Sequence, residues 1–269
     1  MDFGTLIGLF SGVGIIAIGV LRGGGDLYWF FSLNSILIVI GGTIAAAMVN
    51  YPIKNILGLF GVLRNVFTSD EYDYQGVIGE LVEKGEKARK NGVLSLEADL
   101  PSIESTFLRN GIELAINERD SARLRNYLNL EMSNIENRHK MGQEIFFYLG
   151  AYAPAFGMLG TVMGLIIMMN NFSGGSVADI NSIDFDVGKK FAQLLGGMGL
   201  ALITTFYGVL LANLVFLPIG GKLTRKSQEE MMLKSIVVEG IISIHSKEHP
   251  ILMREKLMTF VPQSARLES

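Results

Sequence analysis

The chain has 269 residues, of which 49% are hydrophobic and 18% are charged, and its formal net charge is −3. Long apolar runs alternate with charged connections, which is the pattern of a membrane protein and not of one large soluble core. The slightly acidic balance gives no sign of nucleic-acid binding. The absence of cysteine excludes disulfides, thiol catalysis and thiolate metal sites.

Four apolar runs contain no charged residue and reach the roughly 17–25 residues that a membrane-spanning helix needs. They lie at 3–21, 31–49, 145–169 and 191–217. The first two predict a transmembrane hairpin in residues 1–49, and the last two predict a second hairpin in residues 145–217 with a periplasmic link at 170–190. The start of the chain carries Asp2 and no basic segment, so we expect the first run to remain as a span.

Basic residues predict the orientation of these spans. Twelve of the 23 basic residues lie in the connection at 50–144, and eight lie in the tail at 218–269. The positive-inside rule places both segments, and both termini, in the cytoplasm. We therefore expect a multi-pass protein of the cell inner membrane.

Helical periodicity continues outside the membrane. Apolar residues recur at helical spacing in 74–91, and Asn91-Gly92 is a stop signal. We expect Pro101 to begin a helix, residues 120–140 to extend the third span, and the fourth span to extend to about Lys247. The motif His249-Pro250 should end that helix, with a last short helix at 251–260. The predicted fold is an all-α membrane protein, with four transmembrane helices, a large helical cytoplasmic domain between spans 2 and 3, and a helical C-terminal tail.

The sequence carries no sign of an enzyme or of a bound cofactor or metal. It has no Walker A loop and no evident Ser/His/Asp set, and its three histidines lack ligand partners at metal spacing: His139, His245 and His249. We expect these histidines to be solvated or to cap helices. The four spans also lack Asp, Glu, Lys, Arg and His, although ion transporters normally need an intramembrane ionisable group. Either the chain transports nothing, or a partner brings the titratable residue.

The third span has the features of a helix that packs against other helices. Pro154 cannot donate a hydrogen bond to the carbonyl of Gly150, which favours a kink. Gly160 and Gly164 form a small-residue contact motif of the kind that lets membrane helices approach closely.

Hydroxyl groups lie on the same faces. Met158 and Thr161 share the face of the proline, and in the fourth span Thr205 lies with Thr204 beside it. Thr161 and Thr205 are candidate oxygen ligands for a cation that sheds its water. The alternative is that each hydroxyl only bonds back to its own helix, and spacing alone favours that alternative.

A charged cluster surrounds a predicted helix end in the long connection. Glu86, Arg89 and Lys90 precede the turn, and Glu97 follows it. Taken alone, mixed charges of this kind favour a solvated face.

Four segments together resemble a known family. They are residues 88–97, 150–165, 201–218 and 251–262, which carry the charged cluster, the proline–glycine–threonine pattern, the Thr204-Thr205 pair with Pro218, and the last short helix. In these motifs the chain closely resembles the flagellar motor stator subunits of the MotA and PomA family. The similarity covers nearly the whole chain.

The resemblance implies partners and roles. It implies a homopentamer around two copies of a single-span MotB or PomB subunit, which binds peptidoglycan and carries the ion-binding aspartate. That partner would explain the missing intramembrane charge. Arg89 and Glu97 correspond to the charges that engage the rotor protein FliG, with Lys90 and Glu86 as companions. The two functional prolines correspond to Pro154 and Pro218.

The resemblance also bears on the transported ion. Thr205 corresponds to the family's threonine in the ion path, where we also place Thr161, Thr204, Met158 and Pro154. Proton-type members tend to have alanine where this chain has Thr161, and a hydroxyl oxygen can replace a water of Na⁺ hydration. We therefore expect a transient Na⁺ near Thr161 and Thr205 with a partner aspartate, and H⁺ is the alternative ion. The stretch Asn170–Gly196 departs from the family by its length and its acids (Asp179, Asp184 and Asp186).

The expected function is an ion-channel-forming stator subunit that couples cation flow to rotation in motility and chemotaxis. One alternative is an ExbB or TolQ type energiser of an outer-membrane system, but the hairpin at 3–49 and the charged cluster speak against it. The other alternative is a stand-alone ion transporter, but the absence of charged residues from the four spans argues against it.

Overall fold

The computed structural model describes residues 3–68, 72–173 and 187–261, so the acidic link around Asp179–Asp186 lies outside the described residues. The regular structure of the described part is helical, with no strand. Helices long and apolar enough to cross a membrane occur at four places: Phe3–Arg22, Leu27–Asn50, Ser121–Asn170 and Leu194–His245. The predicted all-α class with four transmembrane helices is confirmed, as is the large helical region between spans 2 and 3.

The chain forms two compact units. The first contains Met1–Ser69 and Met141–Leu223, and the second contains Asp70–Lys140 and Thr224–Ser269. Each unit is described by itself below. The predicted extensions of the third and fourth spans are also present, because α7 runs unbroken over Ser121–Ser173 and the fourth span's helix reaches His245.

In the first unit, the N-terminal hairpin begins with α1 (Phe3–Arg22), none of whose residues is buried in this chain. Its partner is not one regular helix. It starts with a 3-10 turn whose Asp26 cap accepts a hydrogen bond from the Tyr28 N–H. A π turn then interrupts the α-helix of this second span. The elements follow in the order η1 (Leu27–Phe30), α2 (Leu33–Ile36), the π turn η2 (Leu37–Gly41) and α3 (Gly42–Asn50). Tyr28 and Trp29 are exposed, and aromatic residues between two spans are typical of the belt at a membrane interface.

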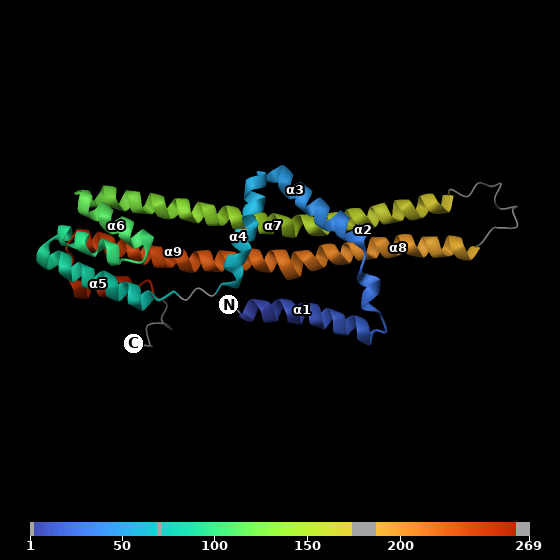
Figure 1. The fold of residues 1–269 in the computed structure, drawn as a ribbon, viewed down its shortest axis with the longest axis horizontal. Helices are drawn as coiled ribbons and strands as arrows, with labels where there is room; N and C mark the ends of the chain where they lie inside the picture. Colours follow the sequence, from blue (N-terminus) through green and yellow to red (C-terminus); the bar gives the residue numbers. More distant parts are fainter. Residues whose placement is uncertain (1–2, 69–71, 174–186, 262–269) are drawn as a thin grey trace. The chain divides into compact units, whose positions relative to one another are not determined.

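The other helices of the first unit pack around an apolar core. After Pro52, helix α4 (Ile53–Phe67) follows, and the unit also contains the apolar half of α7 and three later elements: α8 (Val187–Leu210), the π turn η5 (Leu211–Phe216) and the start of α9 (Leu217–His245). The core combines side chains of α3, α4, α7 and α9, namely Ala47, Leu59, Val66, Ile145, Phe146, Leu149, Ile219 and Leu223. In Figure 1, α4 runs across the direction of α1 and of the apolar part of α7.

The second unit is a helical domain with its own apolar core. It contains α5 (Tyr74–Asn91), the 3-10 segment η3 (Val93–Ser102), α6 (Thr106–Asn117), the first part of α7, most of α9 and α10 (Pro250–Met258). Its fully buried side chains come from all of these elements and include Leu81, Leu96, Leu108, Leu124, Leu128, Ile241 and Leu257. As predicted, α5 ends at Asn91, because Gly92 takes φ 86°, a left-handed conformation that favours glycine.

Two predicted helix boundaries in this unit were wrong. Pro101 does not begin a helix but lies inside η3, and α6 begins only after Ser105. The reason is a cap, since the Ser105 hydroxyl accepts a hydrogen bond from the N–H of Leu108. Likewise, His249 does not end the preceding helix, which stops at His245, but caps α10 by accepting from the N–H of Ile251.

Candidate functional site

Helices α7 and α8 approach so closely that several of their residues must be glycine. A Cβ atom at Gly157 would lie 2.9 Å from the carbonyl oxygen of Thr204, and one at Gly164 would lie 2.9 Å from that of Gly197. A Cβ at Gly160 would lie 2.6 Å from the side chain of Thr204. The small-residue motif predicted from the sequence therefore packs against α8, and it brings two threonine-bearing helix faces together.

At this contact the hydroxyls of Thr161 and Thr205 meet, with 2.6 Å between their Oγ1 atoms. The Thr161 hydroxyl can also donate to the carbonyl oxygens of Gly157 at 3.1 Å and Ala201 at 3.3 Å. The Thr205 hydroxyl lies 3.4 Å from each of the same two oxygens. Each hydroxyl can thus bond back to its own helix and also across to the other, so neither bonds only within its own helix. Their role as cation ligands stays a prediction.

The cluster contains more oxygen lone pairs than protons. Thr204, which is fully buried, also donates to the Ala201 carbonyl, at 2.9 Å. Three hydroxyls share two carbonyl acceptors, and each hydroxyl has only one proton to donate. Rotation of the Thr161 and Thr205 hydroxyls would leave oxygen atoms free to face a cation, so the cluster can act chemically as part of a dehydrating cation site.

The hydroxyl pair borders an exposed apolar strip. On α7, Met158 is 62% exposed and Leu165 is 43% exposed, and on α8, Leu202 is 68% exposed. By helical spacing these residues lie beside Thr161 and Thr205, on the edge of the α7–α8 contact. Met158 thus lies on the strip and forms no part of the hydroxyl cluster. A strip of this kind can receive a further apolar helix.

The two prolines predicted as functional occur in different settings. Pro154 lies within the unbroken α7 and is backed by α8, where a Cβ at Gly208 would lie 2.6 Å from the carbonyl oxygen of Ala153. Pro218 is exposed and is the second residue of α9, directly after the π turn η5. In that turn the Leu217 N–H donates to the carbonyl of Ala212, five residues back, so the hydrogen-bonding pattern changes just before the proline.

Sequence reasoning missed Tyr207, which ties α8 to the N-terminal hairpin. Its hydroxyl donates to the carbonyl of Phe30 and accepts from the N–H of Ser32 at 3.4 Å. The neighbouring Phe206 packs edge-on against Phe30, with ring centroids 5.2 Å apart. The only signal in the sequence was a tyrosine in the middle of an apolar run, where a buried hydroxyl needs a partner.

The charged cluster of the second unit lies where α5 ends. Lys90 forms an ion pair with Glu86 at 2.5 Å. The hydrogen bond from Lys90 holds the pKa of the Glu86 carboxyl below its usual value. Lys87 reaches both carboxylate oxygens of Asp99, at 2.6 and 2.7 Å, and so fastens α5 to η3.

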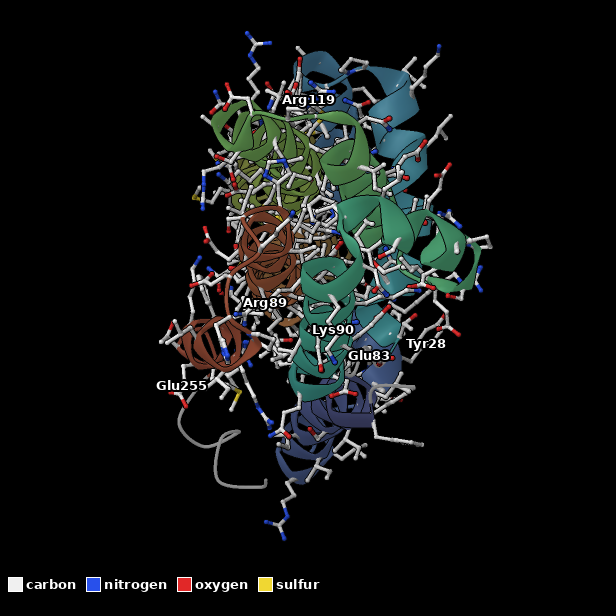
Figure 2. All side chains as sticks on the ribbon, turned by 90° about the vertical axis from the view of Figure 1, so that its left-hand side faces the viewer. Tyr28, Glu83, Arg89, Lys90, Arg119 and Glu255 are labelled. Carbon is white, nitrogen blue, oxygen red and sulfur yellow. The ribbon has the colours of Figure 1, made fainter. Side chains whose placement is uncertain are left out.

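Arg89 and Glu97 are left as the unpaired charges of this corner. Both are exposed, and neither makes an ion pair among the residues that the structure describes. Figure 2 labels Arg89 and Lys90 at the surface of the unit. The backbone beside these charges is anchored in the core of the unit, because Ala88 and Leu96 are fully buried. An open groove of about 450 Å³ adjoins it, lined by Glu86, Arg89, Lys90, His249 and Pro250.

Residues 99–235 match the model of the "MotA/TolQ/ExbB proton channel family". The chain is 34% identical to "Motility protein A" of Borreliella burgdorferi, an alignment that covers 99% of this chain and 96% of the relative. This chain belongs to the MotA/TolQ/ExbB proton channel family, as a flagellar motor stator subunit of the MotA/PomA type.

Two further similarities agree with this MotA-type assignment. "Uncharacterized protein YtxD" of Bacillus subtilis is also 34% identical, over 96% of this chain and 90% of the relative. The solved "Structure of the flagellar MotAB stator complex from Bacillus subtilis" contains a chain with a TM-score of 0.83 and 28% identity, covering 98% of this chain and 97% of that one. This MotA-type chain is a multi-pass membrane protein and not an enzyme.

Proposed function

We propose that this MotA-type chain conducts a cation along the α7–α8 face together with a single-span partner of the MotB or PomB type. The observation that carries the proposal is the Thr161–Thr205 hydroxyl pair, which lies within charge-free spans and beside an exposed apolar strip. A helix laid on the strip could bring a carboxylate to the hydroxyls. The titratable group that ion coupling requires would then come from the partner.

The assembly and orientation that we propose follow the family resemblance. Five copies of the chain would surround two partner helices, with the apolar strip of each copy facing inward. Both termini and the second unit would lie in the cytoplasm, as the distribution of basic residues indicates. The partner would be anchored to peptidoglycan, so that ion flow turns the ring against a fixed axis.

We further propose that the favoured cation is Na⁺. A sodium ion must exchange hydration water for protein oxygens, whereas a proton needs no such set of ligands. The hydroxyls of Thr161 and Thr205 and the carbonyls of Gly157 and Ala201 supply oxygens within one cluster. The partner carboxylate would complete this set and neutralise the charge of the ion.

The test compares Thr161→Ala with Thr161→Ser in a host that lacks its own stators and is supplied with this chain and its partner. Thr161→Ala should make swimming speed less dependent on external sodium while assembly persists. Thr161→Ser keeps the hydroxyl and should retain the wild-type sodium response. If swimming responds to sodium identically in all three proteins, or stops with a protonophore and ignores sodium, the sodium assignment is wrong.

The exposed charges of the second unit would deliver the torque. In this proposal, Arg89 and Glu97 engage the charged surface of a FliG-type rotor protein, because they are exposed and have no ion-pair partner among the residues described by the structure. Glu86 and Lys90 already neutralise each other. They would therefore shape the contact rather than carry its attraction.

A further inference from the structure

Helix α4 carries two faces that differ in what covers them. On one face, Leu59 and Val66 are buried in the core of the first unit. On the opposite face, Ile53 is 57% exposed and Leu57 is 63% exposed. Exposed aliphatic side chains of this size, next to the membrane-spanning helices of the same unit, indicate a surface that meets something other than water.

The exposed face of α4 is also uniformly cationic. Lys54 and Arg64 are both exposed, and neither makes an ion pair among the described residues. The sequence from 27 to 69 contains no Asp or Glu, so no acidic side chain of this segment can neutralise them. Apolar residues interleaved with unpaired basic residues are the pattern of helices that lie at a membrane surface.

The direction of α4 fits the same location. The helix follows the second span after Tyr51 and Pro52 and runs across the direction of α1 and of the apolar part of α7 (Figure 1). Because those helices cross the bilayer, a helix that runs across them lies along the membrane plane. Long basic side chains can then extend to the phosphate layer while their stems and the aliphatic residues stay among the acyl chains.

We propose that the face formed by Ile53, Lys54, Leu57 and Arg64 binds anionic phospholipid. Lys54 and Arg64 would each hold one headgroup phosphate, since their separation of ten positions along the helix places their backbones about 15 Å apart, too far for one phosphate. Ile53 and Leu57 cover the upper acyl chains. This lipid contact depends neither on which ion the protein conducts nor on the rotor contact.

The first test counts lipids that stay bound. The full-length protein is purified from vesicles containing equal amounts of phosphatidylglycerol and phosphatidylcholine, and native mass spectrometry measures which lipid remains. The wild type should retain phosphatidylglycerol preferentially. Lys54→Gln combined with Arg64→Gln should lower that preference, by roughly fivefold for each charge removed at low ionic strength. The matched control removes two exposed charges of the second unit, with Arg119→Gln and Arg123→Gln, and should leave the preference unchanged.

The second test uses the absence of cysteine, which allows a single labelled site. A polarity-sensitive fluorophore is attached at Leu57→Cys or, as a control, at Leu94→Cys, where the native leucine is 68% exposed in the second unit. In anionic vesicles, brominated lipids should quench the label at 57 and leave the label at 94 unaffected.

Two outcomes would overturn the proposal. In one, the paired charge substitutions and their control retain the same ratio of the two lipids. In the other, the label at 57 is as open to aqueous iodide as the label at 94, or it is shielded from iodide in vesicles while brominated lipids fail to quench it, which would show that a second protein chain covers this face.

Discussion

At the scale of single residues, Glu239 is a carboxyl of the second unit whose pKa is strongly lowered. It pairs with Arg125 of α7 and, at 3.0 Å, with Lys256 of α10. The hydrogen bond from Arg125, together with that from Lys256, lowers the pKa of Glu239 to about 2. Glu239 lies well beyond the apolar run at 191–217, in the helical domain. This one side chain therefore links three helices by charge, and the link exists only while the carboxyl is ionised.

The pH dependence of stability follows from the direction of this shift. A carboxyl whose pKa is lower in the folded state stabilises the fold above its unfolded pKa, about 4.3, and loses that contribution as the pH falls toward 2. Because Arg125 is 40% exposed, we expect solvent screening to reduce the contribution to about 1 kcal/mol. Circular-dichroism melting of the purified proteins should therefore show that Glu239→Gln loses less stability than the wild type between pH 5 and pH 3. The difference between the two losses should be on the order of 1 kcal/mol. Parallel losses in the two proteins would assign the acid sensitivity to other groups.

At the scale of elements, the contact between α7 and α8 determines the position of the hydroxyl pair. The contact depends on backbone approaching backbone, which only glycine permits. Gly208 shows this most clearly, because a Cβ there would lie 2.6 Å from the carbonyl oxygen of Ala153 and 3.1 Å from the Cα of Pro154. Gly199 of the same helix has no atom within 4 Å of such a Cβ.

These two glycines form a matched pair for mutation. Gly208→Ala should push α8 away from α7 and destabilise the protein by about 1–3 kcal/mol, the usual cost of overpacking. Gly199→Ala should be neutral or slightly stabilising, because both changes gain the same helix propensity but only the first meets backbone. Thermal melting of the detergent-solubilised protein measures the difference. Equal melting temperatures for the two variants would contradict the close contact.

At the scale of the whole molecule, the sequence predicted those features that depend on interactions between residues close together in the chain. Charge-free runs of about 20 residues predict spans because hydrocarbon tolerates no unpaired charge, and Asn91-Gly92 predicted the end of α5. Partners distant in the sequence were not predictable. Helical spacing places Thr161 on a face but does not say that Thr205 lies opposite it, and nothing local indicated that Tyr207 bonds to Phe30. Pro101 was misread because a later serine, Ser105, supplies the actual cap.

Under the proposed function, exposed charges of the second unit deliver torque to the rotor, and substitution of Arg89 tests this. Arg89→Glu should abolish or strongly reduce swimming, because it reverses a charge that forms no ion pair within the described part of the chain. A charge reversal at the opposing rotor position should restore part of the speed.

Lys90→Gln provides the comparison and should have a smaller effect than Arg89→Gln, since Lys90 is already paired with Glu86. Tethered-cell rotation measures torque in each strain. If no rotor reversal improves Arg89→Glu while stators still assemble, Arg89 acts within its own subunit and does not contact the rotor.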